Sequence, residues 1–219
     1  MSEHFTGFSP ETEDFFWELC FNNDRTWFYQ HKESFETLIG NPMKALARDT
    51  TEILVSRYPD TELAAKVSRI WRDARRLFGR GPLKESMWFS IRNGRPGAFP
   101  VSFYFELKPA TFTCGMGYWC ENAKVSEAFR ARVDSNPAEF IRLAKEINKL
   151  DGFVLEGPEY RKPKGDFGPA ANNWYNRKWV DLNHTENFGG AILLPEYPEI
   201  LADFFGQFMS MFEFLSGIA

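Results

Sequence analysis

The sequence is poor in the residues that metal sites and disulfide frameworks require. It has three cysteines, an odd number without Cys-x-x-Cys spacing, and three scattered histidines. No histidine has a metal-ligating residue four positions further along the chain. The pattern therefore predicts neither a disulfide framework nor a zinc site, and this cysteine usage fits a reducing cytoplasm best.

The motifs of several large enzyme classes are also missing. The chain has no GxxxxGK[ST] phosphate loop, no Rossmann GxGxxG after a strand and no GxSxG nucleophile elbow. No paired-carboxylate motif stands out either. The familiar nucleotide-binding, kinase and hydrolase interpretations fail, so the sequence identifies no cofactor and does not decide whether the protein is an enzyme.

Long apolar runs are missing as well. The C-terminal stretch ILADFFGQFMSMFEFLSGI comes closest to the ~18 apolar residues that a membrane span needs, but Asp203, Gln207 and Glu213 interrupt it. The opening residues MSEHFTGF do not show the charged-then-apolar pattern of a secretion signal. We expect a soluble cytoplasmic protein with no membrane partner.

Aromatic residues, in contrast, are abundant. They make up 17% of the chain, with 23 phenylalanines, and hydrophobic residues reach 43%. Apolar residues recur at helical spacing before residue 58 and again after residue 123, whereas the segments 86–92, 101–108 and 111–120 alternate with period two. This order predicts a single α+β domain over residues 1–219, with helices packed on one face of a mostly antiparallel sheet.

The later part of the chain is expected to mix short strands with helices. Helices are predicted at 124–134, 137–150 and 198–215, and short strands near 153–157 and 178–182. The segment between these strands is rich in Gly, Pro and Asn, so it is either a solvated connection or a lid over a site.

Positive charge is concentrated in one part of the chain. The 26 basic and 30 acidic residues give a net charge of −4, yet residues 66–95 hold nine Lys or Arg against Asp73 and Glu85, a local charge of +7. The rest of the chain carries −11. With an overall pI near 5.5 and no RNA-binding motif, nucleic acid is not an expected partner.

Two interpretations of this basic segment remain open. Its cations either converge on a small phosphate- or carboxylate-bearing ligand, which the planar guanidinium binds bidentately, or they pair with the protein's own acids while their stems cover aromatic rings. In the first interpretation Asp73 would orient the arginines, and His31 would be the candidate for proton transfer. His31 also lies in an apolar stripe, where a hydrogen-bonded core histidine is the alternative. The predicted ligand-binding residues are Arg69, Arg72, Arg75, Arg80, Lys84, Trp88, Arg92, Tyr104 and Lys178.

A different function would use the C-terminal aromatic stripe. The stripe consists of Leu201, Phe204, Phe205, Phe208, Met209, Phe212 and Leu215. On this alternative the protein is a non-catalytic interaction module, with the stripe as a homodimer or partner interface. Ordinary core packing of the stripe is the simpler interpretation.

Two motifs resemble one family of conserved hypothetical proteins, a bacterial and fungal domain of unknown function. The first is a Gly-Phe-(Ser/Thr)-Pro start followed by Asn-Asn-x-x-x-Trp-Phe-x-x-(His/Asn)-(Lys/Arg). The second is Arg-Ile-x-Arg-Asp-x-Arg followed by Pro-x-Lys. They match Gly7, Phe8, Pro10, Asn22, Asn23, Trp27, Phe28, His31, Lys32, Arg69, Ile70, Arg72, Asp73, Arg75, Pro82 and Lys84. Between the last arginine and the proline, RLFGRG replaces the family's Phe-Ser-x-Asp-Lys-(Ser/Thr). The resemblance implies one domain in a cytoplasmic setting and names no substrate.

Overall fold

The N-terminal third of the chain is helical in the computed structural model, which describes residues 4–119 and 122–217. It contains α1 (Glu11–Phe21), α2 (Arg25–Gln30), α3 (Lys32–Phe35), the π-helical turn η1 (Glu36–Gly40) and α4 (Asn41–Arg57). Asp24 caps α2 by accepting a hydrogen bond from the backbone N–H of Trp27 at 2.9 Å.

In the described ranges, six strands form one sheet with the order β1-β2-β3-β4-β6-β5. They are β1 (Leu63–Val67), β2 (Met87–Asn93), β3 (Ser102–Leu107), β4 (Thr111–Tyr118), β5 (Val154–Glu156) and β6 (Val180–Asn187). Every neighbouring pair is antiparallel. The predicted meander of β2, β3 and β4 is confirmed.

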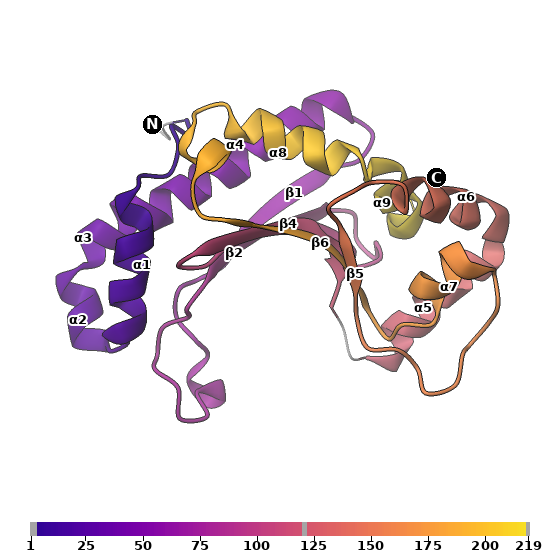
Figure 1. Cartoon of the computed structure of the whole chain (residues 1–219), viewed down its shortest axis with the longest axis horizontal. Coiled ribbons are helices and arrows are strands. Elements are labelled where there is room, and N and C mark those ends of the chain that lie inside the picture. The colour runs from indigo at the N-terminus through magenta and orange to yellow at the C-terminus, as the bar shows by residue number, and fades with distance from the viewer. Residues whose placement is uncertain (1–3, 120–121, 218–219) are drawn as a thin grey trace.

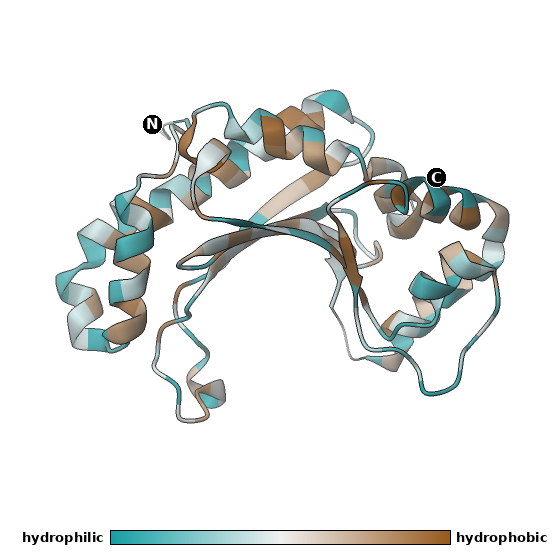
Figure 2. Ribbon diagram, viewed as in Figure 1, coloured by the Kyte–Doolittle hydropathy of each residue, from teal (hydrophilic) through white to brown (hydrophobic). Residues whose placement is uncertain are grey.

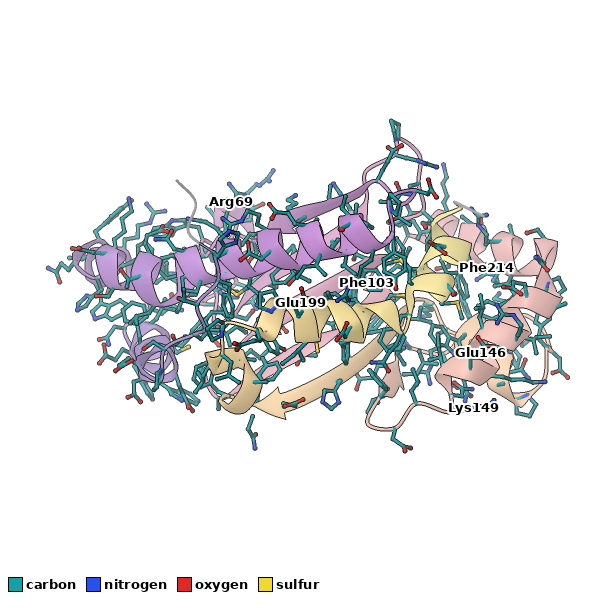
Figure 3. All side chains as sticks on the ribbon, turned by 90° about the horizontal axis from the view of Figure 1, so that it is seen from above. Arg69, Phe103, Glu146, Lys149, Glu199 and Phe214 are labelled. Atoms are coloured by element: carbon teal, nitrogen blue, oxygen red, sulfur yellow. The ribbon has the colours of Figure 1, made fainter. Side chains whose placement is uncertain are left out.

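Helices cover one face of this sheet, which we call the covered face. α4 and α8 (Tyr197–Gly206) lie across it (Figure 1), and hydrophobic residues gather along α8 (Figure 2). Phe103 of β3 stacks on Phe205 at 4.9 Å and on Phe212 of α9 (Met209–Ser216) at 4.6 Å between ring centroids. Seen from above, Phe103 lies between α4 and α8 (Figure 3). The predicted single α+β domain, with helices on one face of the sheet, is confirmed.

The other face, which we call the open face, is flanked at both ends. α1 to α3 and the segment 68–86 project beyond the sheet at one end (Figure 1). At the other end lie α5 (Ala123–Ser135), α6 (Pro137–Ile147) and α7 (Pro169–Tyr175). The open face therefore lies between two projecting parts of the chain.

Three details differ from the sequence prediction. The helix expected over 198–215 is divided into α8 and α9, because the chain turns near Gly206, a poor helix former. β1 was not expected, since Ala64 and Ala65 have low strand propensity and pairing with β2 determines their conformation. The segment between β5 and β6 was predicted as a loop and contains α7.

The aromatic C-terminal stripe belongs to the core of this chain. Leu201, Phe205, Phe208, Met209, Phe212 and Leu215 are each at most 3% exposed. Phe204 is partly buried and packs against the same cluster. These side chains therefore do not form a free surface for a partner. No helix in the described part of the chain is long and apolar enough to cross a membrane.

Candidate binding site on the open face of the sheet

Strand alternation places polar and aromatic side chains together on the open face. Residues 88 and 90 of β2, and 102, 104 and 106 of β3, point away from the covered face because successive side chains alternate across a strand. They enclose a pocket of about 400 Å³, the central pocket. Its lining consists of Trp88, Ser90, Ser102, Tyr104, Glu106, Trp119 and Asp181.

Asp181 of β6 is the most perturbed carboxyl group of the central pocket. The Tyr104 hydroxyl donates to it, with distances of 3.0 and 3.2 Å to the two carboxylate oxygens. Burial raises the pKa of Asp181 to about 6, and the charge of Glu156 adds to this, while hydrogen bonds from Tyr104 and Trp119 offset only part. Within residues 4–119 and 122–217, Asp181 forms no ion pair with Lys, Arg or His.

Tyr104 reaches Asp181 because the strand between them carries glycine at the crossing point. Gly115 of β4 pairs with Tyr104 on one side and Asn183 on the other. A Cβ at Gly115 would lie 3.0 Å from Cε1 of Tyr104 and would also meet the carbonyl of Leu182. Burial and the nearby Asp181 raise the pKa of Tyr104, so its hydroxyl stays protonated and donates.

A second pocket, of about 710 Å³, lies beside the basic segment and is called the cationic pocket. It is lined by Trp17, Cys20, Arg72, Asp73, Arg80, Lys84, Glu85, Ser86, Lys108 and Pro109. Four cations and two acids thus give its lining a formal charge of +2. Of the predicted residues, Arg72, Asp73, Arg80 and Lys84 are brought together here.

The basic segment is held in place by an asparagine from the α1–α2 connection. The side chain of Asn23 accepts from the backbone N–H of Leu83 at 2.8 Å and donates to its carbonyl at 3.1 Å. Leu83 also forms an isolated antiparallel β-bridge with Trp71, which holds the two sides of the segment together. The side chain of Asn23 thus satisfies both backbone groups of Leu83, as a neighbouring strand would.

The two interpretations of the basic segment each describe part of it. Arg72 donates to the carbonyl of Leu83 at 2.7 Å and pairs with Glu85 at 3.2 Å, with 15% of its side chain exposed. Arg75 pairs with Asp73 at 2.8 Å and is largely exposed. These arginines follow the structural interpretation, in which the protein's own acids neutralise them.

Lys84 supports the ligand interpretation. Its ammonium donates to the carbonyl of Arg69 at 2.6 Å and lies 5.7 Å from the ring centroid of Trp88. Burial lowers the pKa of Lys84, and the charges of Arg69 and Arg72 lower it further. Positive charge from these two arginines therefore adds to that of Lys84 here, as expected of an anion site.

The remaining predicted residues lie elsewhere. Arg69, Arg92 and Lys178 are exposed and are not among the residues that line either pocket. His31 follows α2, where its ring stacks on Trp27 at 4.2 Å and Nδ1 lies 2.8 Å from the Trp27 carbonyl. It lines neither pocket, and this hydrogen bond fits the structural interpretation of His31. Trp88 and Tyr104 both line the central pocket.

Nucleophilic and metal chemistry find little support in these pockets. Burial raises the pKa of Cys20 to about 11, with the charge of Glu85 adding to the effect, so the thiol is protonated at neutral pH. Among the described residues, no group of three or more His, Cys, Asp or Glu side chains could hold a metal ion.

The lining residues that sequence reasoning did not predict include Lys108, Trp119 and Asp181. The signal for Asp181 is present in the strand VDLNHTEN, because aspartate is rare inside strands and Val180 and Leu182 on either side are buried. An acid at such a position is a candidate functional group, and the sequence alone does not show that Tyr104 faces it.

The fold and its two pockets define an α+β domain with a polar site on the open face of an antiparallel sheet. The sequence model of one family, described as conserved hypothetical protein (DUF2461), matches residues 11–188, so the chain belongs to this family. The predicted membership of a conserved hypothetical family is thereby confirmed, and every residue that lines the two pockets falls within the matched range. No curated protein matches the chain.

Proposed function

We propose that this protein binds a small anionic ligand, one that carries a phosphate or carboxylate group, in the cationic pocket. The observation that carries the proposal is that four cations line one pocket against two acids. Both acids already engage other side chains, Asp73 with Arg75 and Glu85 with Arg72. The pocket thus presents more positive charge than its own carboxylates balance.

Within this pocket, the two lysines are the groups that would contact the anion most directly. Burial and the charges of Arg69 and Arg72 disfavour the charged form of Lys84, and a bound anion would offset this repulsion. Lys108 reaches the pocket from the end of β3, pairs with Glu106 at 3.1 Å and has 49% of its side chain exposed. Arg72 shapes the pocket wall, because its guanidinium already bonds the carbonyl of Leu83.

Thermal-shift and calorimetric titrations with inorganic phosphate and with succinate test the proposal, against chloride at equal ionic strength. Either anion should stabilise the protein beyond the chloride control. Lys84→Gln and Lys108→Gln should each weaken its binding about ten-fold, since a hydrogen bond to a charged group contributes roughly 1.5 kcal/mol.

Lys44→Gln is the matched control. Lys44 is an exposed lysine of α4 that pairs with Glu36 at 2.9 Å, away from both pockets. Its loss should leave anion affinity unchanged within about two-fold. Equal weakening by Lys44→Gln and Lys84→Gln, or the same stabilisation by chloride as by phosphate and succinate, would refute the proposal.

A further inference from the structure

The central pocket has the opposite chemistry to the cationic pocket. Its seven described lining residues include two carboxylates, Glu106 and Asp181, and no Lys or Arg. Its walls are aromatic, with Tyr104 and Trp119 meeting edge to face at 4.8 Å between ring centroids and an interplanar angle of 87°. Perpendicular rings around a partly buried carboxylate form walls on more than one side of a bound group.

We propose that the central pocket is a subsite for an organic ammonium group. Cations are attracted to the faces of tryptophan and tyrosine rings, and this attraction grows when water is excluded. The Tyr104 hydroxyl already donates its hydrogen bond to Asp181, so its oxygen offers lone pairs to the pocket. The site is rich in acceptors and negative charge, which favours a positively charged donor and repels an anion.

The state of Asp181 supports this assignment. Its hydrogen-bond partners are neutral groups, and the charge that acts on its pKa is that of another carboxylate, Glu156. Burial without a counter-charge makes ionised Asp181 unfavourable, as its raised pKa indicates. A bound ammonium would supply the missing counter-charge inside the pocket.

The two pockets adjoin along β2 and β3. Ser86 lines the cationic pocket and Trp88, two residues on, lines the central pocket; Lys108 and Glu106 are related in the same way on β3. Two contacts join the linings, Lys84 to the Trp88 ring at 5.7 Å and Lys108 to Glu106 at 3.1 Å. Because two strand residues advance about 7 Å, a ligand that reaches from one lining to the other must extend at least about 7 Å.

This spacing specifies the class of ligand. The ligand is a two-ended molecule, with a phosphate or carboxylate at one end and an ammonium group at least about 7 Å away. The two-ended ligand rests on the proposed anion site, whereas the ammonium subsite does not. The two claims are therefore tested with separate probes.

The ammonium subsite is tested with choline and its neutral isostere 3,3-dimethyl-1-butanol, which has the same shape without the charge. Calorimetry should show choline binding about ten-fold more tightly than the isostere. Asp181→Asn keeps the acceptor for Tyr104 and removes the charge, so it should weaken choline binding about ten-fold and leave the isostere unaffected.

Glu199→Gln is the control for charge removal at a distance. Glu199 lies on α8 of the covered face (Figure 3), where it pairs with Arg57 at 2.6 Å. It should not change choline affinity. Equal binding of choline and the isostere, or equal weakening by Glu199→Gln and Asp181→Asn, would overturn the ammonium subsite. In that case the anion site would still be tested separately, by the binding of phosphate or succinate.

Tethered probes test whether one ligand spans both pockets. The probe 6-(trimethylammonio)hexyl phosphate can place its charges about 10 Å apart, whereas phosphocholine is too short. Because tethering makes the second contact intramolecular, the long probe should bind about a hundred-fold more tightly than choline or phosphate alone. Lys84→Gln and Asp181→Asn should each weaken it. A long probe that binds no better than choline alone would overturn the two-ended ligand.

Discussion

The two faces of the sheet are formed by the same strands and differ in the contacts that their side chains make. On the covered face, residues such as Phe89, Phe103 and Phe105 are fully buried and stack on neighbouring rings. On the open face, Tyr104 of β3 and Asp181 of β6 form a polar contact inside a pocket. The comparison teaches that stability is concentrated on one face, while the other keeps a partly buried carboxyl group that costs stability.

The largest effect should come from the covered face. Phe103→Ala removes a ring stacked between two others and should lower the free energy of unfolding by about 3–5 kcal/mol in a urea titration. Trp119→Ala is the comparison on the open face, where the side chain is 45% exposed. It should cost less than about 1.5 kcal/mol. Similar losses for the two variants would contradict the division between the faces.

A gain in stability should come from the open face. Because the pKa of Asp181 is raised to about 6 in the folded protein from a reference value of 3.8, its protonated form is favoured by folding. Stability from this group is fully present below pH 4 and is lost as the pH rises through 6. Asp181→Asn removes that loss and should raise the free energy of unfolding by roughly 2 kcal/mol at pH 8, with little change at pH 4.

Asp203→Asn is the control for this pH dependence. Asp203 is exposed on α8 and pairs with Arg57 at 2.7 Å. The difference between Asp203→Asn and the wild type should not grow between pH 4 and pH 8 in the way expected for Asp181→Asn. A destabilised Asp181→Asn at pH 8 would show that the carboxylate supports the fold, the opposite of what its burial without a counter-charge implies.

A smaller effect should follow from releasing the basic segment. Asn23→Ala leaves the backbone N–H of Leu83 without its side-chain partner, while the Leu83 carbonyl keeps the hydrogen bond from Arg72, and should cost about 1–2 kcal/mol. The amide of Leu83 should then exchange faster in hydrogen–deuterium exchange, and phosphate should bind less tightly. Asn22→Ala removes a side chain that donates to the carbonyl of Glu18 and should leave the exchange of Leu83 unchanged. If the exchange of the Leu83 amide were unchanged in Asn23→Ala, this would contradict the claim that Asn23 holds the basic segment in place.

The smallest effect should come from a surface ion pair over the covered face. Glu199→Gln breaks the pair with Arg57, in which both side chains are at least 36% exposed. The free energy of unfolding should change by less than about 0.5 kcal/mol, because exposed pairs are screened and entropically costly. A loss as large as that of Asn23→Ala would mean that ion pairs, as well as packing, hold α8 on the sheet.

The sequence predicted the parts of this structure that depend on periodicity. The alternation in β2, β3 and β4 determines which side chains meet the helices, so the aromatic core and the open face with Trp88 and Tyr104 could both be derived. The break between α8 and α9 could not, because tertiary packing decides whether a single glycine interrupts a helix. β1 was missed for the same reason, since pairing with β2 outweighs the low strand propensity of its alanines.

The candidate site was predictable only where charge alone locates it. The cluster of cations in residues 66–95 pointed to Arg72, Arg80 and Lys84, which do share a pocket. Sequence distance hid the contact between Tyr104 and Asp181, which are 77 positions apart and meet across Gly115. His31 was proposed for proton transfer from its chemistry alone, and its place beside Trp27 depends on a helix end that the pattern did not resolve.

The most direct test of the two pockets and their opposite charge preferences is an NMR titration of the tryptophan indole N–H signals with phosphate and, separately, with choline. Trp17 lines the cationic pocket, Trp88 and Trp119 line the central pocket, and Trp174 is fully buried away from both. We predict that phosphate shifts the Trp17 signal, choline shifts those of Trp88 and Trp119, and neither shifts that of Trp174. Identical shift patterns for the two probes, or shifts confined to tryptophans outside the pockets, would contradict the assignment of an anion to one pocket and an ammonium group to the other.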